Sequence, residues 1–197
     1  MLRSLIITSR PIFHLLTLPA ALRQYSSSAW NNRKSEQITT HVWWDIENCR
    51  IPIGVNSYKV TNRIKSALRS NGIDGPVMIR AHGDMLQFNQ ETCLTPLIKT
   101  GVYLKHVPNC GKNSADRSIL DGLDDYVVRN SPPAHIFMIS GDGDFANILH
   151  RLKKNDYNVL LACGSSNCSA ALRSAAAICW DWNELVRGRQ TELVDVH

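Results

Sequence analysis

Short apolar runs alternate with amphipathic stretches along most of this chain. The apolar runs are rich in large and β-branched side chains, which is typical of buried strands. They cover residues 41–45, 76–81, 102–107, 134–140 and 158–162, with a short last run at 178–180. Between them, apolar residues recur at helical spacing over 58–68, 114–129, 145–154 and 169–176, and less regularly over 84–100. This alternation predicts an α/β fold with a mainly parallel sheet and helices on both faces.

Residues 1–28 differ in composition from the rest of the chain. They contain Arg3, Arg10 and Arg23, many Leu, Ser and Thr residues, and no Asp or Glu. An organellar transit peptide has this composition. We therefore expect a mitochondrial matrix transit peptide at 1–28, a linker at 29–40, the folded domain at 41–187 and a C-terminal tail at 188–197. A plastid, peroxisomal or secretory signal is the alternative, although Arg10 and Pro11 interrupt the apolar stretch that secretion requires.

Charge says little about partners once this segment is set aside. The formal net charge is +5, and the three arginines of residues 1–28 account for three of those charges, which leaves +2. So small an excess is only a weak argument for a nucleic-acid partner. No apolar run is long enough to span a bilayer, so we expect no membrane association.

Six cysteines are spread along the chain without the spacing of a zinc site. They are Cys49, Cys93, Cys110, Cys163, Cys168 and Cys179. No C-x-x-C pair and no H-E-x-x-H motif occurs, so zinc is not expected. In a reducing compartment we expect mostly free thiols, several of them packed as small hydrophobic side chains.

Acidic side chains follow three of the expected strands. Asp45 ends the first strand, Asp142 and Asp144 follow the fourth, and Asp116 lies in the first turn of the helix after the third. Because the carboxyl ends of parallel strands meet at one edge of a sheet, we expect these four aspartates to share a cleft. Anions held so close repel one another unless a cation or a proton lies between them.

Oxygen ligands favour Mg²⁺ or Mn²⁺ over softer metals. Such an ion can bind a phosphodiester, activate a water and neutralise charge on the leaving oxygen. Each aspartate has an ordinary structural explanation as well. Asp116 could stabilise the start of its helix, Asp142 or Asp144 could be a helix N-cap, and Asp45 could end its strand in a turn. Asp142 is the least cap-like of them, and caps alone do not explain carboxylates on three connections at one sheet edge.

Other residues are expected to support the aspartates or to hold substrate. They are Asn48, Arg50, Lys112, Asn113 and Ser140, with Glu47 and Asp121 as weaker candidates. Glu47 is expected to point away from the partners of Asp45 or to act as an outer ligand through water. Asp121 lies about 140° around its helix from Asp116, so the two do not easily face one cleft.

Three segments resemble the motifs of a known family. Trp44-Asp-Ile-Glu-Asn-Cys49, Gly111-Lys-Asn-Ser-Ala-Asp116 and Ile139-Ser-Gly-Asp-Gly-Asp-Phe145 resemble, in order and spacing, those of NYN domains in the PIN-like nuclease superfamily. The type found in meiosis regulator and mRNA stability factor proteins and their plant relatives is the most similar. The resemblance implies a Rossmann-like three-layer α/β/α sandwich and metal-dependent ribonuclease activity. By match of motif it gives metal-binding roles to Asp45, Asp116, Asp142 and Asp144, with Asn48 as companion of Asp45.

The sequence thus predicts an RNA endonuclease that uses Mg²⁺ or Mn²⁺ in organellar RNA processing or turnover. Single-stranded RNA is the expected substrate, and an RNA-binding protein could supply specificity, because the chain has no room for further RNA-binding domains. One alternative is a non-catalytic RNA-binding or adaptor module. Another is a Toprim-like phosphotransfer enzyme, which places a Glu after its first strand, as Glu47 is here. Oligomeric state, target sequence and metal number stay open.

Overall fold

The computed structural model describes residues 38–111 and 113–189. Six strands form one sheet, in which every neighbouring pair is parallel. They are β1 (Thr40–Asp45), β2 (Val77–Gly83), β3 (Val102–His106), β4 (His135–Ile139), β5 (Asn158–Cys163) and β6 (Ile178–Asp181). All six expected strands are present, with ends shifted by at most two residues. The expected α/β/α fold is confirmed.

The strand order β3-β2-β1-β4-β5-β6 places β1 and β4 side by side at the centre of the sheet. The chain moves outward from β1 in one direction to β3 and in the other direction from β4 to β6. The order therefore reverses between β1 and β4, and a crevice opens there at the carboxyl ends of the strands. Asp45 ends β1, and Ser140 follows β4, so the acidic motifs lie on both sides of this crevice.

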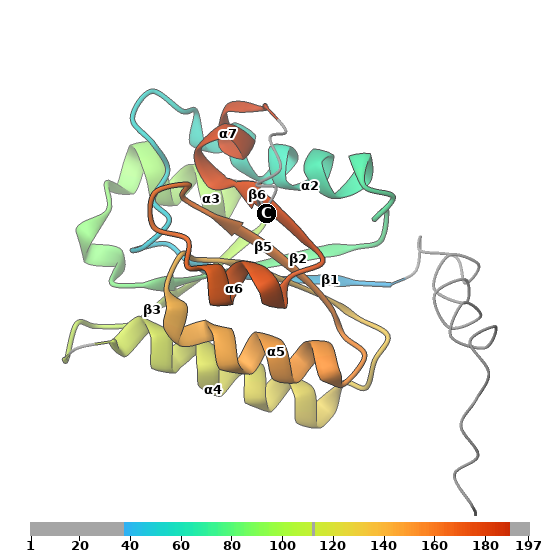
Figure 1. Cartoon of the computed structure of the whole chain (residues 1–197). Helices are drawn as coiled ribbons and strands as arrows, with labels where there is room; N and C mark the ends of the chain where they lie inside the picture. The colour runs from blue at the N-terminus through green and yellow to red at the C-terminus, as the bar shows by residue number, and fades with distance from the viewer. Residues whose placement is uncertain (1–37, 112, 190–197) are drawn as a thin grey trace, which may run out of the picture. The chain divides into compact units, whose positions relative to one another are not determined.

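Helices cover both faces of the sheet (Figure 1). One layer contains α2 (Val60–Ser70), α3 (Thr95–Lys99) and α7 (Trp182–Arg187), and the other contains α4 (Ser114–Arg129), α5 (Ala146–Lys154) and α6 (Ala170–Ala175). The adjacent residues Trp43 and Trp44 point to opposite faces because side chains alternate along a strand. Trp43 packs in the core beneath α4 and α5, and Trp44 in the core beneath α2 and α7. Both are buried.

The irregular helical stretch around residues 84–100 divides into three short helices. They are η3 (Met85–Gln87), η4 (Gln90–Leu94) with π-helical geometry, and α3. Two further short helices, η2 (Ser57–Lys59) and η5 (Gly143–Phe145), precede α2 and α5. Ser114 is not the N-cap of α4, because Asn113 takes that position with φ 61. Asp181 caps α7, since its side chain accepts a hydrogen bond from Glu184 N at 2.9 Å.

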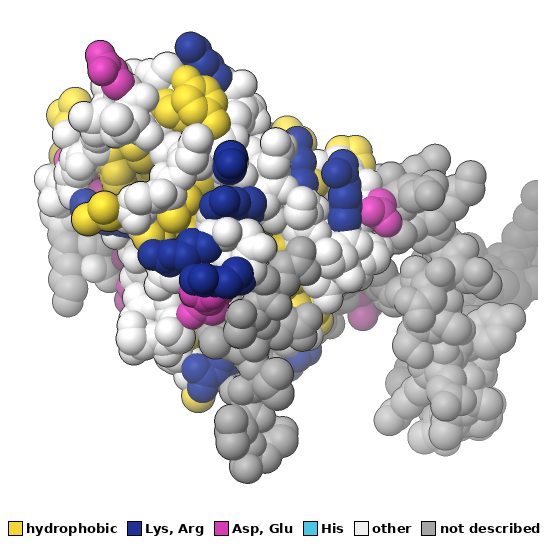
Figure 2. Space-filling view, turned by 90° about the horizontal axis from the view of Figure 1, so that it is seen from above, with side chains coloured by type: hydrophobic (Ala, Val, Ile, Leu, Met, Phe, Trp, Pro, Cys, Tyr) yellow, Lys and Arg dark blue, Asp and Glu magenta, His cyan; other side chains and the backbone are white. Residues whose placement is uncertain are grey.

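Helices α2 and α4, which cover opposite faces of the sheet, differ in charge. Figure 2 views the layer of α2 and α7, where Lys and Arg side chains outnumber Asp and Glu. Within their helical bounds, α2 carries Arg63, Lys65 and Arg69, and no acid. On the opposite layer, α4 carries Asp121, Asp124 and Asp125. Within the described residues, no helix is long and apolar enough to cross a membrane.

Candidate metal centre

Asp45 lies at the base of the crevice, where residues of its own motif and of the motif after β4 hydrogen-bond to it. The carboxyl group is 3% exposed. Its Oδ1 accepts a hydrogen bond from Asn48 N at 3.2 Å, and its Oδ2 accepts one from Ser140 Oγ at 3.1 Å. Burial raises the pKa of Asp45 to about 6, and the charges of Asp116 and Glu47 act in the same direction, against the lowering effect of the two hydrogen bonds. A neighbouring cation would relieve this cost.

The loop after β4 is fastened to Asp45 and Asn48. Ser140 Oγ, which donates to Asp45, also accepts from Asp142 N at 3.1 Å. The Gly141 amide donates to Asn48 Oδ1 at 2.9 Å. Asp142 Oδ1 then accepts from Asp144 N at 2.9 Å, so Asp142 is the N-cap of η5. The expectation that Asp142 is the least cap-like acid was wrong, because a short helix begins at Gly143, two residues earlier than the sequence indicated.

Asp116 approaches from the other wall, in the first turn of α4. With Asp45, Asp142 and Glu47 it lines a cavity of about 360 Å³. Burial raises the pKa of Asp116, and the charges of Asp142, Asp144 and Glu47 raise it further. The lining of the cavity shows that acids from three separate connections face the same space, as predicted.

Asp144 stands at the rim of the cavity rather than on its wall. It is exposed, and its Oδ2 accepts a hydrogen bond from Asn113 Nδ2 at 3.3 Å. Asn113 and Asn48 line the cavity. The expected supporting positions of Asn48, Asn113 and Ser140 thus agree with the structure, whereas Lys112 lies outside the described residues.

The remaining three candidates, Glu47, Arg50 and Asp121, do not all line the cavity. Glu47 does not point away from Asp45 but lines the cavity, and its Oε1 accepts from Asp84 N at 2.6 Å. Arg50 lies away from the acids, because its Nη2 donates to Gln87 at 2.9 Å and its guanidinium lies 5.0 Å from the Phe88 ring centroid. Asp121 is exposed and does not line the cavity.

The donor set fits a hard divalent ion that keeps part of its water shell. Among the described residues, all the charged groups on the cavity wall are carboxylates, which suit Mg²⁺ or Mn²⁺. None of the ion pairs in the described part of the chain involves Asp45, Asp116 or Asp142. Over residues 38–111 and 113–189, no three carboxylates lie within 4.8 Å of one another. The spacing therefore leaves room for water between an ion and some of the acids.

Asn167, in the loop after β5, is a neighbour of the site that the sequence did not indicate. Its Nδ2 donates to Asn48 Oδ1 at 3.5 Å. A Cβ on Gly141 would lie 2.8 Å from Asn167 Oδ1, so only glycine fits at that position. The contact is long-range, and no spacing in the sequence marks it.

A family model for the NYN domain matches residues 39–182, which include every acid of the cavity. The chain belongs to the NYN domain family. NYN domains are part of the PIN-like superfamily of RNA nucleases, so the resemblance of the three motifs is confirmed.

Curated relatives agree with this assignment. The chain is 27% identical over 135 residues, or 68% of its length, to meiosis regulator and mRNA stability factor 1 of Xenopus tropicalis. It is 26% identical over 147 residues, or 74% of its length, to the protein of the same name from Bos taurus. In each case the match covers 8% of the relative's own length, so the similarity concerns one domain of a much longer protein.

The fold also recurs in a solved structure. A protein of unknown function from Vibrio parahaemolyticus superimposes with a TM-score of 0.53 at 15% identity, over 76% of this chain and 96% of that protein. At so low an identity the likeness concerns the fold alone.

Proposed function

We propose that this protein is an endoribonuclease that requires Mg²⁺ or Mn²⁺ and hydrolyses phosphodiester bonds of single-stranded RNA. The observation that carries the proposal is the convergence of Asp45, Asp116 and Asp142 on one cavity, where no described residue forms an ion pair with them. A structural role alone gives no reason to bury Asp45 beside other acids, which raise its pKa further. Membership of an RNA nuclease superfamily supports the same conclusion.

The protein's own groups have distinct roles in this proposal. Asp45, Asp116, Asp142 and Asp144 hold the ion, directly or through its waters. When bound, a divalent ion neutralises phosphate charge and lowers the pKa of a water that can attack phosphorus. Ser140 orients Asp45 and fixes the loop that carries Asp142, because its hydroxyl bonds to both.

A second hollow, lined by residues of β2, β3 and α4, is the path that we propose for the RNA strand. It measures about 400 Å³ and includes Arg80, Tyr103, Lys105 and Arg129 in its lining. Lys105 in β3 places positive charge on the strand that leads toward the cavity, which is lined by Val107 after β3. Arg129 in α4 is paired with Asp125, which also lines the hollow. Tyr103 is 64% exposed, so a base could stack on its ring. Basic and aromatic groups together suit a single strand.

The proposal is tested by cleavage of labelled single-stranded RNA with the purified chain, with Mg²⁺ or Mn²⁺ and with excess EDTA. We expect cleavage that EDTA abolishes and that Asp142→Asn eliminates while the circular dichroism spectrum stays unchanged. Equal cleavage by Asp142→Asn, or cleavage in EDTA, would contradict the proposal. RNA binding without any cleavage would instead establish the non-catalytic alternative.

We further propose that the protein acts in mitochondria, on the basis of the composition of residues 1–28. A fluorescent protein fused after residue 40 should enter mitochondria, and Arg23→Ala should impair its processing. Import into plastids or peroxisomes, or secretion, would contradict this localisation.

A further inference from the structure

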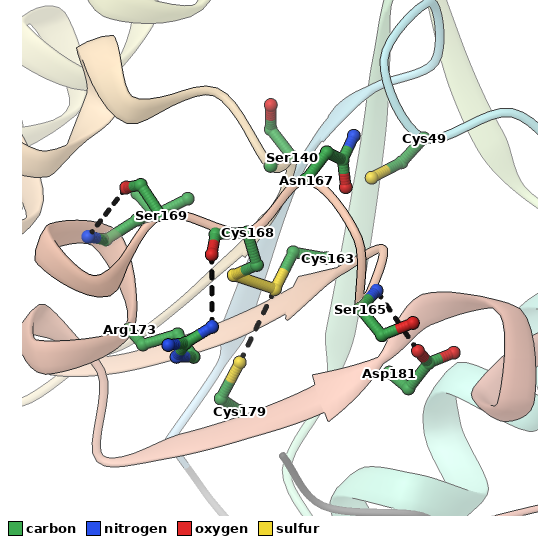
Figure 3. Close-up of a disulfide and its surroundings, with 12 residues drawn as sticks. Cys49, Ser140, Cys163, Ser165, Asn167, Cys168, Ser169, Arg173, Cys179 and Asp181 are labelled. Atoms are coloured by element: carbon green, nitrogen blue, oxygen red, sulfur yellow. Dashed lines mark hydrogen bonds between the residues drawn. A yellow bond between two sulfur atoms is a disulfide. The ribbon is translucent and has the colours of Figure 1, made fainter. Parts of the chain in front are cut away.

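Three cysteine sulfurs lie close together between β5, β6 and the loop before α6 (Figure 3). Cys163 ends β5, Cys168 precedes α6, and Cys179 lies in β6. Cys163 and Cys168 form a disulfide, and Cys179 Sγ lies 3.6 Å from Cys163 Sγ. The three sulfurs lie within 4.8 Å of one another. The expectation of mostly free thiols therefore holds for four of the six cysteines. It was wrong for this pair because the turn after β5 brings their Cα atoms to 5.6 Å.

The disulfide closes a short ring that contains Asn167, the neighbour of the acidic cavity. Asn167 directly precedes Cys168, and its side chain packs between Gly141 and Gly164. A Cβ at Gly164 would lie 2.6 Å from Asn167 Oδ1. The same side chain donates to Asn48 Oδ1, which also accepts from the Gly141 amide. The bond between Cys163 and Cys168 thus fastens a loop that contacts two motifs of the candidate nuclease site.

We propose that Cys163, Cys168 and Cys179 form a thiol–disulfide exchange site that fastens or releases the Asn167 loop. Cys163 is fully buried and shared by both pairings, whereas Cys168 and Cys179 are 9% and 8% exposed. In one state the disulfide joins Cys163 to Cys168 and holds the loop. In the other it joins Cys163 to Cys179, links β5 to β6, and leaves Cys168 as a thiol.

The exchange step balances without an oxidant. Cys179 loses its proton to water, and its thiolate attacks Cys163 Sγ. The bond between Cys163 and Cys168 breaks, and Cys168 leaves as a thiolate that takes up a proton. One disulfide is lost and one is gained. A small dithiol reduces either state and is itself oxidised to a cyclic disulfide, and a glutathione-type disulfide restores the bond by accepting two electrons.

The effect on the cavity rests on the proposed nuclease function, but the exchange itself does not. With the loop fastened, Asn167 supports Asn48, whose backbone amide donates to Asp45. With the loop released, this support is lost. We therefore expect weaker Mn²⁺ binding in the released state, by about fivefold, the lower end of the usual coupling between linked sites.

The exchange is tested on the full chain equilibrated in a glutathione redox buffer, acid-quenched, alkylated and mapped by mass spectrometry. The wild type should give both disulfides. Cys168→Ser should give the pair Cys163–Cys179, and Cys179→Ser only the pair Cys163–Cys168. Cys93→Ser, which alters a thiol in η4, is the matched control and should resemble the wild type.

Two results would overturn the exchange site. The first is a folded Cys168→Ser protein in which Cys163 and Cys179 are both alkylated after oxidation. The second is one Zn²⁺ bound per reduced wild-type chain and lost in each of the three cysteine variants, which would make the cluster a metal site.

Mn²⁺ titration of the two serine variants then tests the link to the cavity. Cys179→Ser, with the loop fastened, should bind Mn²⁺ about fivefold more tightly than Cys168→Ser. Equal affinities would overturn the link. If the disulfides shift as expected and no variant cleaves RNA, the exchange site stands and the nuclease proposal fails, so the two failures are distinguishable.

Discussion

The acidic cavity and the cysteine cluster lie toward the same carboxyl edge of the sheet, but they differ in the chemistry of their side chains. The cavity gathers hard oxygen ligands, and burial together with the neighbouring acids raises the pKa of Asp45 and of Asp116. The cluster gathers soft, largely buried sulfurs, two of which satisfy each other in a covalent bond. The carboxylates of the cavity therefore need a cation from outside the chain, whereas the disulfide of the cluster needs no ligand. We infer that one region binds a ligand and that the other adjusts the loop between them.

The largest expected effect comes from removing a charge on the cavity wall. Asp116→Asn should lower the RNA cleavage rate by more than about 100-fold, since even groups that only orient metal ligands usually cost 10–100-fold. Asp121→Asn, on the exposed side of the same helix, is the matched control and should retain full activity. Similar losses in both variants would break the distinction between cavity and surface acids.

In the absence of metal, Asp45→Asn should raise the stability of the fold, although it should lower the cleavage rate. Asp45 has a pKa of 3.8 when unperturbed and about 6 in the folded protein. The folded state thus holds the proton more tightly, and the stabilisation is complete below pH 3.8 and lost as pH rises through 6. This difference corresponds to about 3 kcal/mol. In EDTA at about pH 8, Asp45→Asn should therefore unfold at higher urea concentration than the wild type.

The advantage of Asp45→Asn should be smaller than about 3 kcal/mol, because an amide offers one acceptor oxygen where the carboxylate offers two. It should disappear as the pH approaches 4, where the wild-type carboxyl is protonated. Addition of Mg²⁺ should stabilise only the wild type. An Asp45→Asn protein that is less stable than the wild type at every pH would contradict the claim that ionisation of the buried carboxyl group destabilises the fold.

Reduction of the disulfide in the cysteine cluster should lower the stability of the fold. Opening the short ring between Cys163 and Cys168 should lower the free energy of unfolding by about 2 kcal/mol, from the chain entropy that the bond removes. Urea unfolding with and without dithiothreitol measures this difference. Cys110→Ser, a change at an exposed thiol, should leave the difference unchanged, and a reduced protein as stable as the oxidised one would contradict the role of the bond.

A smaller effect is expected for the hydroxyl that orients Asp45. Ser140→Ala removes a donor to Asp45 and an acceptor for Asp142 N, and should slow cleavage by about tenfold. A raised requirement for Mg²⁺ distinguishes this positioning role from a loss of folding. Ser70→Ala at the exposed end of α2 should change neither quantity, and an unaltered rate in Ser140→Ala would remove Ser140 from the site.

The smallest effect is expected for a change in the second hollow, which is lined by Tyr103 and Lys105. Lys105→Ala should weaken RNA binding and reduce the slope of log affinity against log salt by about one. The maximal cleavage rate should stay unchanged, because Lys105 does not line the acidic cavity. Lys153→Ala on α5, which keeps the same change of charge outside both hollows, should leave the salt slope unaltered. Equal slopes in the wild type and Lys105→Ala would remove the hollow from the RNA path.

The sequence was sufficient for the sheet because each strand is a short apolar run between clear helices. The convergence of Asp45, Asp116 and Asp142 was also predictable, since parallel strands end at one edge. The orientation of Glu47 was not, because it depends on a hydrogen bond to Asp84 N, 37 residues further along the chain. The direction of Arg50 depends likewise on Gln87 and Phe88.

The cysteine cluster was missed for a related reason. Its spacing matches no metal or redox motif, and Cys179 reaches Cys163 only because β5 and β6 are neighbours. Asn167 could not be predicted as a neighbour of Asn48, 119 residues earlier, for the same reason. Strand order brings these residues together, and the sequence predicted alternation but not order.

Mn²⁺ titration followed by electron paramagnetic resonance tests the central claim most directly, because it needs no knowledge of the RNA target. The wild-type protein should bind Mn²⁺ in competition with Mg²⁺, and Asp116→Asn and Asp142→Asn should each bind it at least tenfold more weakly, as for loss of a metal-orienting group. Asp121→Asn should bind it as the wild type does. Undiminished Mn²⁺ binding by both cavity variants would contradict the claim that these carboxylates form a metal centre.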